Sequence, residues 1–127
     1  PGGICVLSTP NKTLISPGRE TPLNPFHIRE YDYAQFTRFM QEHFTQVELV
    51  GIFHAGRLKL HDIITRRNFS QFCLDIPPRL NRWFYLPWFL PSLKTRHFNL
   101  AKSGLDQALD FIALGGKGSS LEEVRGG

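Results

Sequence analysis

Residues 3–11 decide the fold class: they read Gly-Ile-Cys-Val-Leu-Ser-Thr-Pro-Asn, an apolar run of β-forming residues that stops at a proline. The run does not alternate between apolar and polar side chains, a pattern typical of a strand covered on both faces in a parallel sheet. A second run, Gln46–Phe53, first alternates and then becomes fully apolar. Between the two, Asp32 and Gln35 form a capping-box pattern before an amphipathic helix. The order strand, helix, strand predicts a βαβ crossover with parallel strands.

The remaining chain predicts a loop, a helical insertion, a third strand and a tail. Residues 12–31 contain three prolines and no helical period, and a loop of this length in a compact domain is usually functional. Residues 108–114 predict the third strand. The predicted organisation is one domain over residues 1–114, with a helical, aromatic-rich insertion at about 55–97, followed by a disordered tail at 115–127.

Composition and cysteine content narrow the class of protein. A chain of 127 residues that is 41% hydrophobic suits one domain or part of one, and it has no run of 18 apolar residues that would predict a membrane-spanning helix. Cys5 and Cys73 lie far apart in apolar contexts and are predicted to be buried, reduced thiols, which fits a cytoplasmic location. No cysteine or histidine pair has zinc-site spacing, so no metal is predicted. The chain opens at Pro1 directly before a strand, and we expect it to be part of a longer domain.

Two motifs carry a resemblance to a known family. Residues 2–11, Gly-Gly-Ile-Cys-Val-Leu-Ser-Thr-Pro-Asn, and residues 24–31, Asn-Pro-Phe-His-Ile-Arg-Glu-Tyr, precede the capped helix and a Val-Glu-Leu-Val-Gly strand. This order resembles class I S-adenosylmethionine-dependent methyltransferases, in particular those acting on small molecules, sugars or lipids. The resemblance covers residues 2–62 well and 98–114 loosely. It implies that the first two strands are the family's fifth and sixth, and that residues 109–114 are its seventh, which runs antiparallel between them.

The resemblance implies an α/β fold: a partial Rossmann-like methyltransferase sheet of three strands, the last antiparallel, with flanking helices and the helical insertion. In that family, a glycine-rich turn after the first strand and an acidic residue closing the second hold the cofactor. No Gly-x-Gly-x-Gly follows a predicted strand here. The chain is therefore expected to be the carboxy-terminal half of the domain, with no cofactor-binding residue of its own. S-adenosylmethionine would be bound mainly by the missing amino-terminal half, and this fragment alone would be inactive.

The segment that leaves the first strand is expected to face the acceptor, because ligands in open α/β sheets bind beyond the carboxyl ends of strands. His27 is the candidate base, since imidazole titrates near neutral pH, and Glu30 is the candidate residue that orients it. The alternative is that both only pin the loop. The other candidates for binding a small-molecule acceptor are Asn11, Asn24, Phe26, Arg29, Tyr31, His54 and Arg57. Asn11 could equally be a turn residue, and His54 and Arg57 exposed or capping positions.

The most apolar stretch is Trp83–Phe89, within a region from Arg57 to Arg96 that holds eight basic residues and two acids. Its prolines argue against one regular helix. It could be a lid packed on its own domain, a partner or homodimer surface, or an acceptor pocket or membrane-surface contact for a lipid-like substrate. Stacking of nucleic-acid bases has no support. The basic region fits either an anionic partner or a solvated helix face. His61 and Asp62 are predicted to form a surface pair.

Two functions therefore stand against each other: a methyltransferase present here as a fragment, and a non-enzymatic half-domain that serves as an interaction or dimerisation module. In the first case the strand at residues 4–7 would lack its neighbours and expose apolar faces. An unpaired strand edge of this kind promotes aggregation. The chain alone is therefore predicted to be poorly soluble, or to dimerise through that edge.

Overall fold

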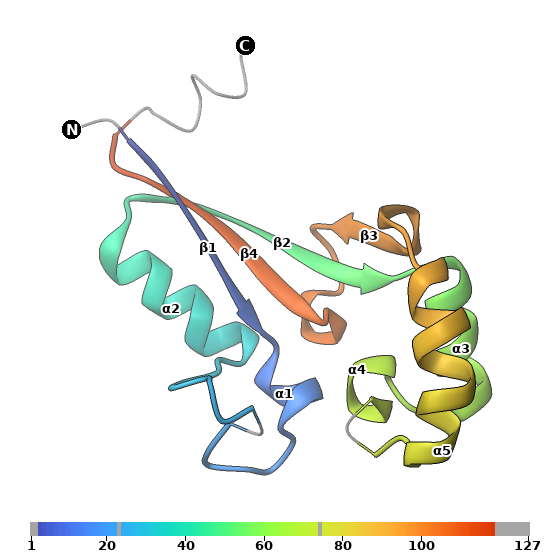
Figure 1. The fold of residues 1–127 in the computed structure, drawn as a ribbon. Coiled ribbons are helices and arrows are strands. Elements are labelled where there is room, and N and C mark those ends of the chain that lie inside the picture. The colour runs from blue at the N-terminus through green and yellow to red at the C-terminus, as the bar shows by residue number, and fades with distance from the viewer. Residues whose placement is uncertain (1–2, 23, 74, 119–127) are drawn as a thin grey trace. The chain divides into compact units, whose positions relative to one another are not determined.

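The computed structural model describes residues 3–22, 24–73 and 75–118 (Figure 1). The chain divides into two compact units. Pro1–Phe53 together with Leu100–Gly127 form one, here called the sheet unit, and His54–Asn99 form the other, here called the helical unit. Each unit is described by itself.

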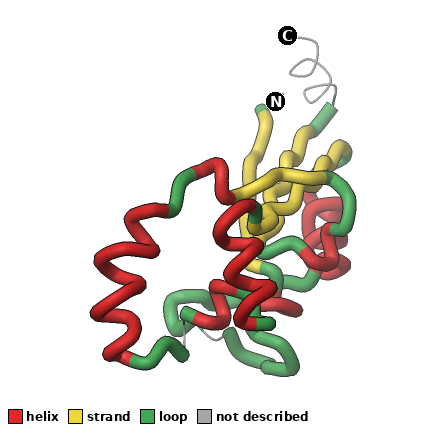
Figure 2. The backbone as a smooth tube through the Cα atoms, turned by 90° about the vertical axis from the view of Figure 1, so that its right-hand side faces the viewer, coloured by secondary structure: helices red, strands yellow, loops and turns green. Residues whose placement is uncertain are grey.

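A four-stranded sheet has the order β1-β4-β2-β3. Its strands are β1 (Ile4–Pro10), β2 (Gln46–His54), β3 (Phe98–Ala101) and β4 (Asp110–Gly116). β4 pairs antiparallel with both β1 and β2, so Ala113 lies opposite Leu7 on one side and Leu49 on the other. Because both neighbours run antiparallel to β4, β1 and β2 run parallel to each other. Figure 2 shows the strands side by side in yellow.

The sheet confirms the mixed α/β class and the antiparallel third strand between the first two, and it corrects two details. It has four strands where three were predicted, because residues 98–101 add a short one. The prediction that the first strand is covered on both faces is wrong for this chain: β1 lies at the sheet edge, and the adjacent residues Val6 and Leu7 are both exposed. Neighbouring strand residues point to opposite faces, so both faces of β1 are open.

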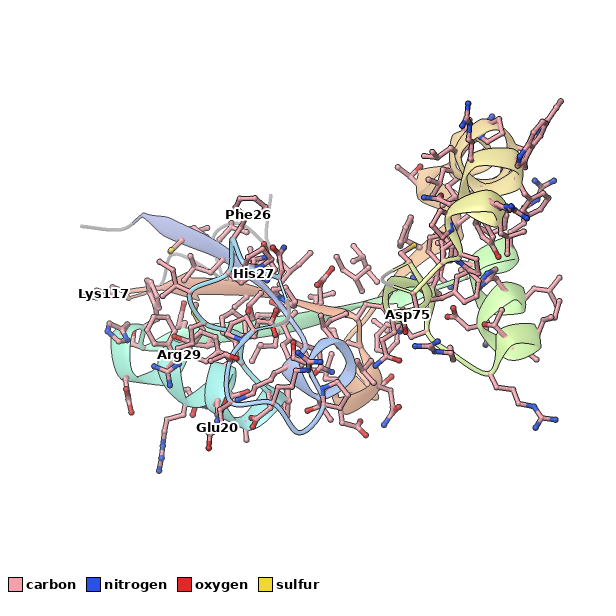
Figure 3. The ribbon with its side chains drawn as sticks, turned by 60° about the horizontal axis from the view of Figure 1, so that its bottom comes forward. Glu20, Phe26, His27, Arg29, Asp75 and Lys117 are labelled. Carbon is pink, nitrogen blue, oxygen red and sulfur yellow. The ribbon has the colours of Figure 1, made fainter. Side chains whose placement is uncertain are left out.

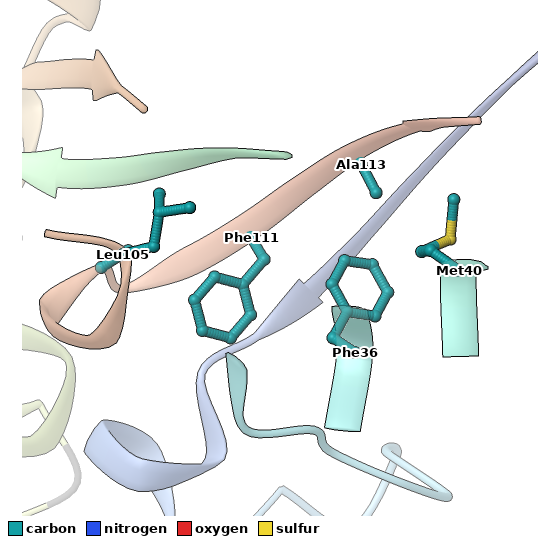
Figure 4. Packing of buried hydrophobic residues seen from close by; sticks show 6 residues of the cluster. Phe36, Met40, Leu105, Phe111 and Ala113 are labelled. Carbon is teal, nitrogen blue, oxygen red and sulfur yellow. The ribbon is translucent and has the colours of Figure 1, made fainter. Parts of the chain in front are cut away.

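The core of the sheet unit forms where α2 (Tyr33–His43) packs on β4 (Figure 4). α2 begins at the predicted capping box, in which Asp32 Oδ1 accepts from the Gln35 amide at 2.8 Å. Its predicted stripe is inward-facing, since Phe36 and Met40 are buried against Phe111 and Ala113. The core is completed by residues from the short helix η4 (Leu105–Gln107) and the turn that follows it.

The helical unit consists of short helices. They are α3 (Gly56–Thr65), α4 (Phe69–Phe72), α5 (Pro78–Leu80), η1 (Asn81–Phe89), η2 (Leu90–Ser92) and η3 (Thr95–His97). α3 ends at Arg66, whose φ of 52° is left-handed, so the predicted helix is broken there. The expectation that prolines prevent one regular helix at Trp83–Phe89 needs refinement. These residues form a continuous π-helix with Pro87 inside it, and the wider i→i+5 spacing appears in the hydrogen bond from the Leu90 amide to the Tyr85 carbonyl.

Two smaller predictions are also corrected. Both cysteines are free thiols, but only Cys5 is partly buried, while Cys73 is exposed. The predicted tail begins too early, because Gly115 and Gly116 are buried at the end of β4. A side chain at Gly115 would meet the Phe44 ring at 2.5 Å, so close packing requires glycine there. Residues 119–127 of the predicted tail lie outside the described residues, as does Gly2 of the glycine pair.

Candidate functional site

The segment between β1 and α2 is a closed loop, because its two ends meet. Asn11 and Tyr31 form a parallel bridge, and the Lys12 amide donates to the Tyr31 carbonyl at 2.9 Å. The segment starts with α1 (Lys12–Ile15), whose N-cap is Asn11. Its ends are therefore fixed at the carboxyl end of β1, as the sequence predicted for the acceptor side.

Asn11 is buried, and its side chain is used within the chain. Its Oδ1 accepts from the Thr13 amide at 3.0 Å, which caps α1. Its Nδ2 donates to the carbonyls of Asp106 and Ala108, at 3.0 and 2.7 Å. These three bonds engage both the acceptor atom and the donor atom of the amide and join β1 to the turn before β4. Asn11 thus positions the loop, which is the turn role considered for it as an alternative to binding the acceptor.

Glu30 lies at the centre of the loop, and its carboxylate has two partners. Oε2 accepts from the Ser16 hydroxyl at 2.6 Å, and Oε1 lies 2.9 Å from Nδ1 of His27. Glu30 is buried, whereas His27 is half-buried. Figure 3 labels His27 together with its loop neighbours Phe26 and Arg29. Since a carboxylate only accepts, the proton of the His27 ring lies on Nδ1. The two residues predicted as base and orienter are therefore in direct contact.

Asn24 contacts the other nitrogen of the His27 ring and fixes its role. The Phe26 amide donates to Oδ1 of Asn24 at 3.0 Å, so the amide nitrogen of Asn24 is the atom that faces Nε2 of His27, at 3.2 Å. An amide nitrogen only donates, so Nε2 accepts and carries no proton. The Asn24 amide thus faces Nε2 of His27, and the Glu30 carboxylate faces Nδ1 on the other side of the ring.

Both neighbours of His27 in the sequence are much more exposed than His27 itself. Phe26 is 89% exposed and Ile28 is 99% exposed, so two apolar side chains bracket the imidazole. Arg29 stacks over the Tyr31 ring at 4.7 Å, and that ring packs against Phe39 of α2, 5.6 Å away. A polar pocket of about 130 Å³ lies beside Glu30 and is lined by Lys12, Glu20, Pro22, Ile28, Arg29, Glu30 and Gln35. Arg29 thus lines the pocket, and the Tyr31 ring under its guanidinium group helps to hold Arg29 in place.

The remaining predicted residues, His54 and Arg57, belong to the helical unit. Nδ1 of His54 lies 2.5 Å from Oδ2 of Asp62, and the ring is buried between Phe69 and Phe98. Arg57 is exposed. The sequence analysis gave an exposed position as one alternative for His54, and the buried ring rules it out. The prediction that His61 and Asp62 form a surface pair is also wrong. Asp62 instead binds His54 and accepts from the Phe69 amide at 2.7 Å.

His61 is the polar residue of the helical unit that the sequence prediction misplaced. It is buried, and its Nε2 lies 2.9 Å from the Tyr85 hydroxyl. Its ring contacts those of Phe69 and Phe72 at 5.0 and 4.8 Å, and Nδ1 has no hydrogen-bond partner among the described residues. Burial lowers the pKa of His61, an effect that Asp62 opposes and His54 reinforces. The helical period did indicate this burial, because His61 lies three residues after the buried Leu58 and therefore on the same face of α3.

The described residues contain no group of three histidine, cysteine or acidic side chains placed to hold a metal ion. In the same part of the chain, every helix is too short or too polar to cross a bilayer. The segment after β1 enters the four-residue α1 without a glycine, so the backbone there does not form the glycine-rich turn that holds a nucleotide at a helix start.

Comparison with known proteins gives relatives of one kind. The chain is 48% identical over 124 residues to a probable S-adenosylmethionine-dependent methyltransferase of Mycolicibacterium smegmatis, a match that covers 90% of the chain and 46% of that protein. It is 32% identical over 123 residues to a protein of the same description from Mycobacterium tuberculosis, covering 88% of the chain and 43% of the relative. No family model matches, and no solved structure matches.

The chain thus spans about half the length of the curated relatives it matches. These relatives share one description, that of a probable S-adenosylmethionine-dependent methyltransferase.

Proposed function

We propose that the protein containing this chain is a class I S-adenosylmethionine-dependent methyltransferase, and that this chain supplies its acceptor side. The identity to proteins of that description carries the proposal. The position of β4, antiparallel between the parallel β1 and β2, is consistent with a partial Rossmann-like methyltransferase sheet. A small-molecule, sugar or lipid-like acceptor remains the proposed class.

The described residues do not fit S-adenosylmethionine as a complete site. The turn after β1 has no glycine and is closed by the Asn11 bonds, and no described helix follows the glycines that end β4. A dinucleotide-type site needs close backbone approach at such a turn. We therefore propose that residues outside this chain bind the cofactor, and that this chain alone is inactive.

His27 is the proposed base of the site. Its Nδ1 proton is held by Glu30, and this bond stabilises the imidazolium that forms when Nε2 takes a proton. Ser16 keeps the carboxylate in place through its second oxygen. An acceptor hydroxyl would replace the Asn24 amide at Nε2 and so reach the ring nitrogen that is free to take its proton.

The other loop residues have proposed binding roles that follow from their exposure. Phe26 would contact an apolar part of the acceptor beside His27, and Arg29 would contact polar groups in the pocket next to Glu30. Tyr31 holds Arg29 by stacking and takes a supporting role. Asn24 binds a hydroxyl or is displaced by one. His54 and Arg57 remain weaker proposals, since His54 is buried within the helical unit.

The alternative function is an interaction or dimerisation module. The exposed apolar side chains of the edge strand β1 favour it, because such an edge pairs readily with another chain. A homodimer or partner at Trp83–Phe89 would serve the same function. A cytoplasmic location remains a proposal under either reading.

The test uses the full-length protein, with S-adenosylmethionine labelled in its methyl group and a metabolite and lipid extract of Mycolicibacterium smegmatis as acceptor source. His27→Gln should lower label transfer by about 10²–10⁴-fold while cofactor binding stays unchanged. The matched control is His43→Gln, since His43 is exposed on α2 and its ring bonds the Phe39 carbonyl one turn earlier. Transfer by the His27 variant within threefold of wild type would exclude the proposed base. Absence of both cofactor binding and transfer in the wild-type protein would favour the interaction module.

A further inference from the structure

The helical unit differs from the sheet unit in charge. His54–Asn99 contains eight of the chain's arginines and lysines and only two acids, whereas the remaining chain is slightly acidic. Both acids are engaged: Asp62 binds His54, and Asp75 binds Arg67 at 2.6 Å. The other seven cations are exposed and form no ion pair with the described residues; they are Arg57, Lys59, Arg66, Arg79, Arg82, Lys94 and Arg96.

The same unit exposes large apolar side chains on its helices. Trp83 and Trp88 of η1 are 77% and 71% exposed. They are five residues apart, which is the hydrogen-bond spacing of the π-helix, so they lie about one turn from each other. On α3, Ile63 and Ile64 are also exposed, as is Leu60 one turn earlier. The inward side is already filled by Tyr85 and Phe89 packed around His61, so these outer residues are not needed for the unit's own core.

A short helical unit that exposes tryptophan and aliphatic side chains together with arginines and lysines outside any described ion pair has the composition of an element that lies in the headgroup region of a bilayer. Tryptophan prefers that depth because its ring is apolar and its N–H is polar. Arginine and lysine stems extend along the apolar surface while their charges reach lipid phosphates. We propose that the helical unit is a peripheral membrane-binding element, and that its ligand is a bilayer surface containing anionic lipid.

Charge argues against a second copy of the chain as the occupant. A twofold interface brings the same patch of two subunits together. Here it would oppose a net excess of six positive charges on each side, with no described free carboxylate in the helical unit to balance them. An anionic bilayer supplies the opposite charge and an apolar layer at once. The proposal does not depend on the enzymatic function, since it uses no residue of the His27–Glu30 site.

The test is cosedimentation of the full-length protein with vesicles of pure phosphatidylcholine and with vesicles containing one-third phosphatidylglycerol. Binding is expected only to the anionic vesicles and should weaken as salt is raised. Arg79→Gln with Arg82→Gln should weaken it by roughly 25-fold, at about fivefold for each basic residue. Trp83→Ala with Trp88→Ala should weaken it by at least about tenfold. The control Arg38→Gln removes an exposed arginine of the sheet unit and should leave binding unchanged.

Circular dichroism and the thermal melt of each variant report whether it is folded, and cofactor binding separates this proposal from the enzymatic one. Retained cofactor binding with no vesicle binding by the wild-type protein would overturn the membrane proposal and leave the enzyme intact. Equal binding to neutral and anionic vesicles would also overturn it. So would a concentration-dependent dimer that the tryptophan substitutions abolish, because the patch would then be a protein interface.

Discussion

The described residues contain two histidine–carboxylate pairs, both made through Nδ1 of the histidine, that differ in which partner is buried. In the sheet unit, Nδ1 of His27 lies 2.9 Å from Glu30, with side chains 34% and 1% exposed. In the helical unit, Nδ1 of His54 lies 2.5 Å from Asp62, with side chains 6% and 24% exposed. A base must reach its substrate, so only the first pair presents an imidazole that can act on a ligand. The second pair has the same chemistry, and its buried ring suits it to holding the unit together.

The largest expected effect is on the methyl-transfer rate, and it comes from Glu30, the carboxylate of the first pair. Glu30→Gln should lower the methyl-transfer rate of the full-length protein by about 10²-fold or more, because an amide no longer holds the His27 ring in the tautomer that accepts a proton at Nε2. The KM should change little, since Glu30 is buried and makes no proposed contact with the acceptor. The control is Glu42→Gln on the exposed face of α2. A drop in rate that both variants share would show that the loss of a negative charge, and not the loss of the pair, lowers the rate.

The second prediction concerns Asp62, whose loss should affect stability. Asp62→Ala removes the bond to His54 and the one to the Phe69 amide, and hydrogen bonds to a charged group contribute about 1.5–3 kcal/mol each. Because the Asp62 side chain is 24% exposed, water replaces part of each bond, and we expect the free energy of opening of the helical unit, measured by hydrogen exchange, to fall by about 2–3 kcal/mol in total. Asp75→Ala is the matched control. Its pair with Arg67 is exposed on both sides and should contribute under about 1 kcal/mol. Equal losses would mean that burial of His54 adds nothing.

Ser16→Ala gives a smaller effect on the first pair. It removes one of the two donors to the buried Glu30 carboxylate, so the sheet unit should lose about 1–2 kcal/mol of stability. Ser8→Ala on the exposed part of β1 should stay within about 0.5 kcal/mol of wild type. Hydrogen exchange of the amides in α2 and β4 reports both changes. An unchanged hydrogen-exchange stability in Ser16→Ala would indicate that a water molecule replaces the Ser16 hydroxyl at Glu30 with no loss of free energy.

The smallest prediction is a pH dependence of the helical unit. Burial lowers the pKa of His61 below that of the unfolded chain, so the unfolded state takes up a proton first as the pH falls. His61 therefore stabilises the fold fully above its unfolded pKa, and this stability is lost as the pH falls below it. The opening free energy should decline by up to about 1.4 kcal/mol per pH unit in that window. His61→Phe should lack this part of the decline, whereas a pH dependence equal to wild type would exclude His61 as its source.

The sheet was predictable because its signals are local. The capping box at Asp32, the stripe of Phe36 and Met40, and the β-forming runs of β1 and β2 each fix an element without reference to distant residues. The exposure of Val6 depends on which strands surround β1, so the apolar run alone predicted the opposite, and only the resemblance implied an open edge.

The site was predictable in part for the same reason. His27 and Glu30 are three residues apart, so their contact is a local event. The partners of His54 and His61 come from residues 8 and 24 positions away, through Asp62 and Tyr85, and no sequence period specifies such a pairing. The sequence left Asn11 open between a turn role and acceptor binding, because its bonds go to carbonyls more than 90 positions along the chain.

Native-state modification of histidines by diethyl pyrocarbonate, mapped by mass spectrometry, tests the central comparison most directly. On the full-length protein, His27 should react in the folded state, and Asn24→Ala should speed its reaction by exposing Nε2. His54 should react only as the helical unit unfolds. Reaction of His54 at a rate equal to that of His27, or no change at His27 on Asn24→Ala, would contradict the assignment of the exposed pair as the reactive one.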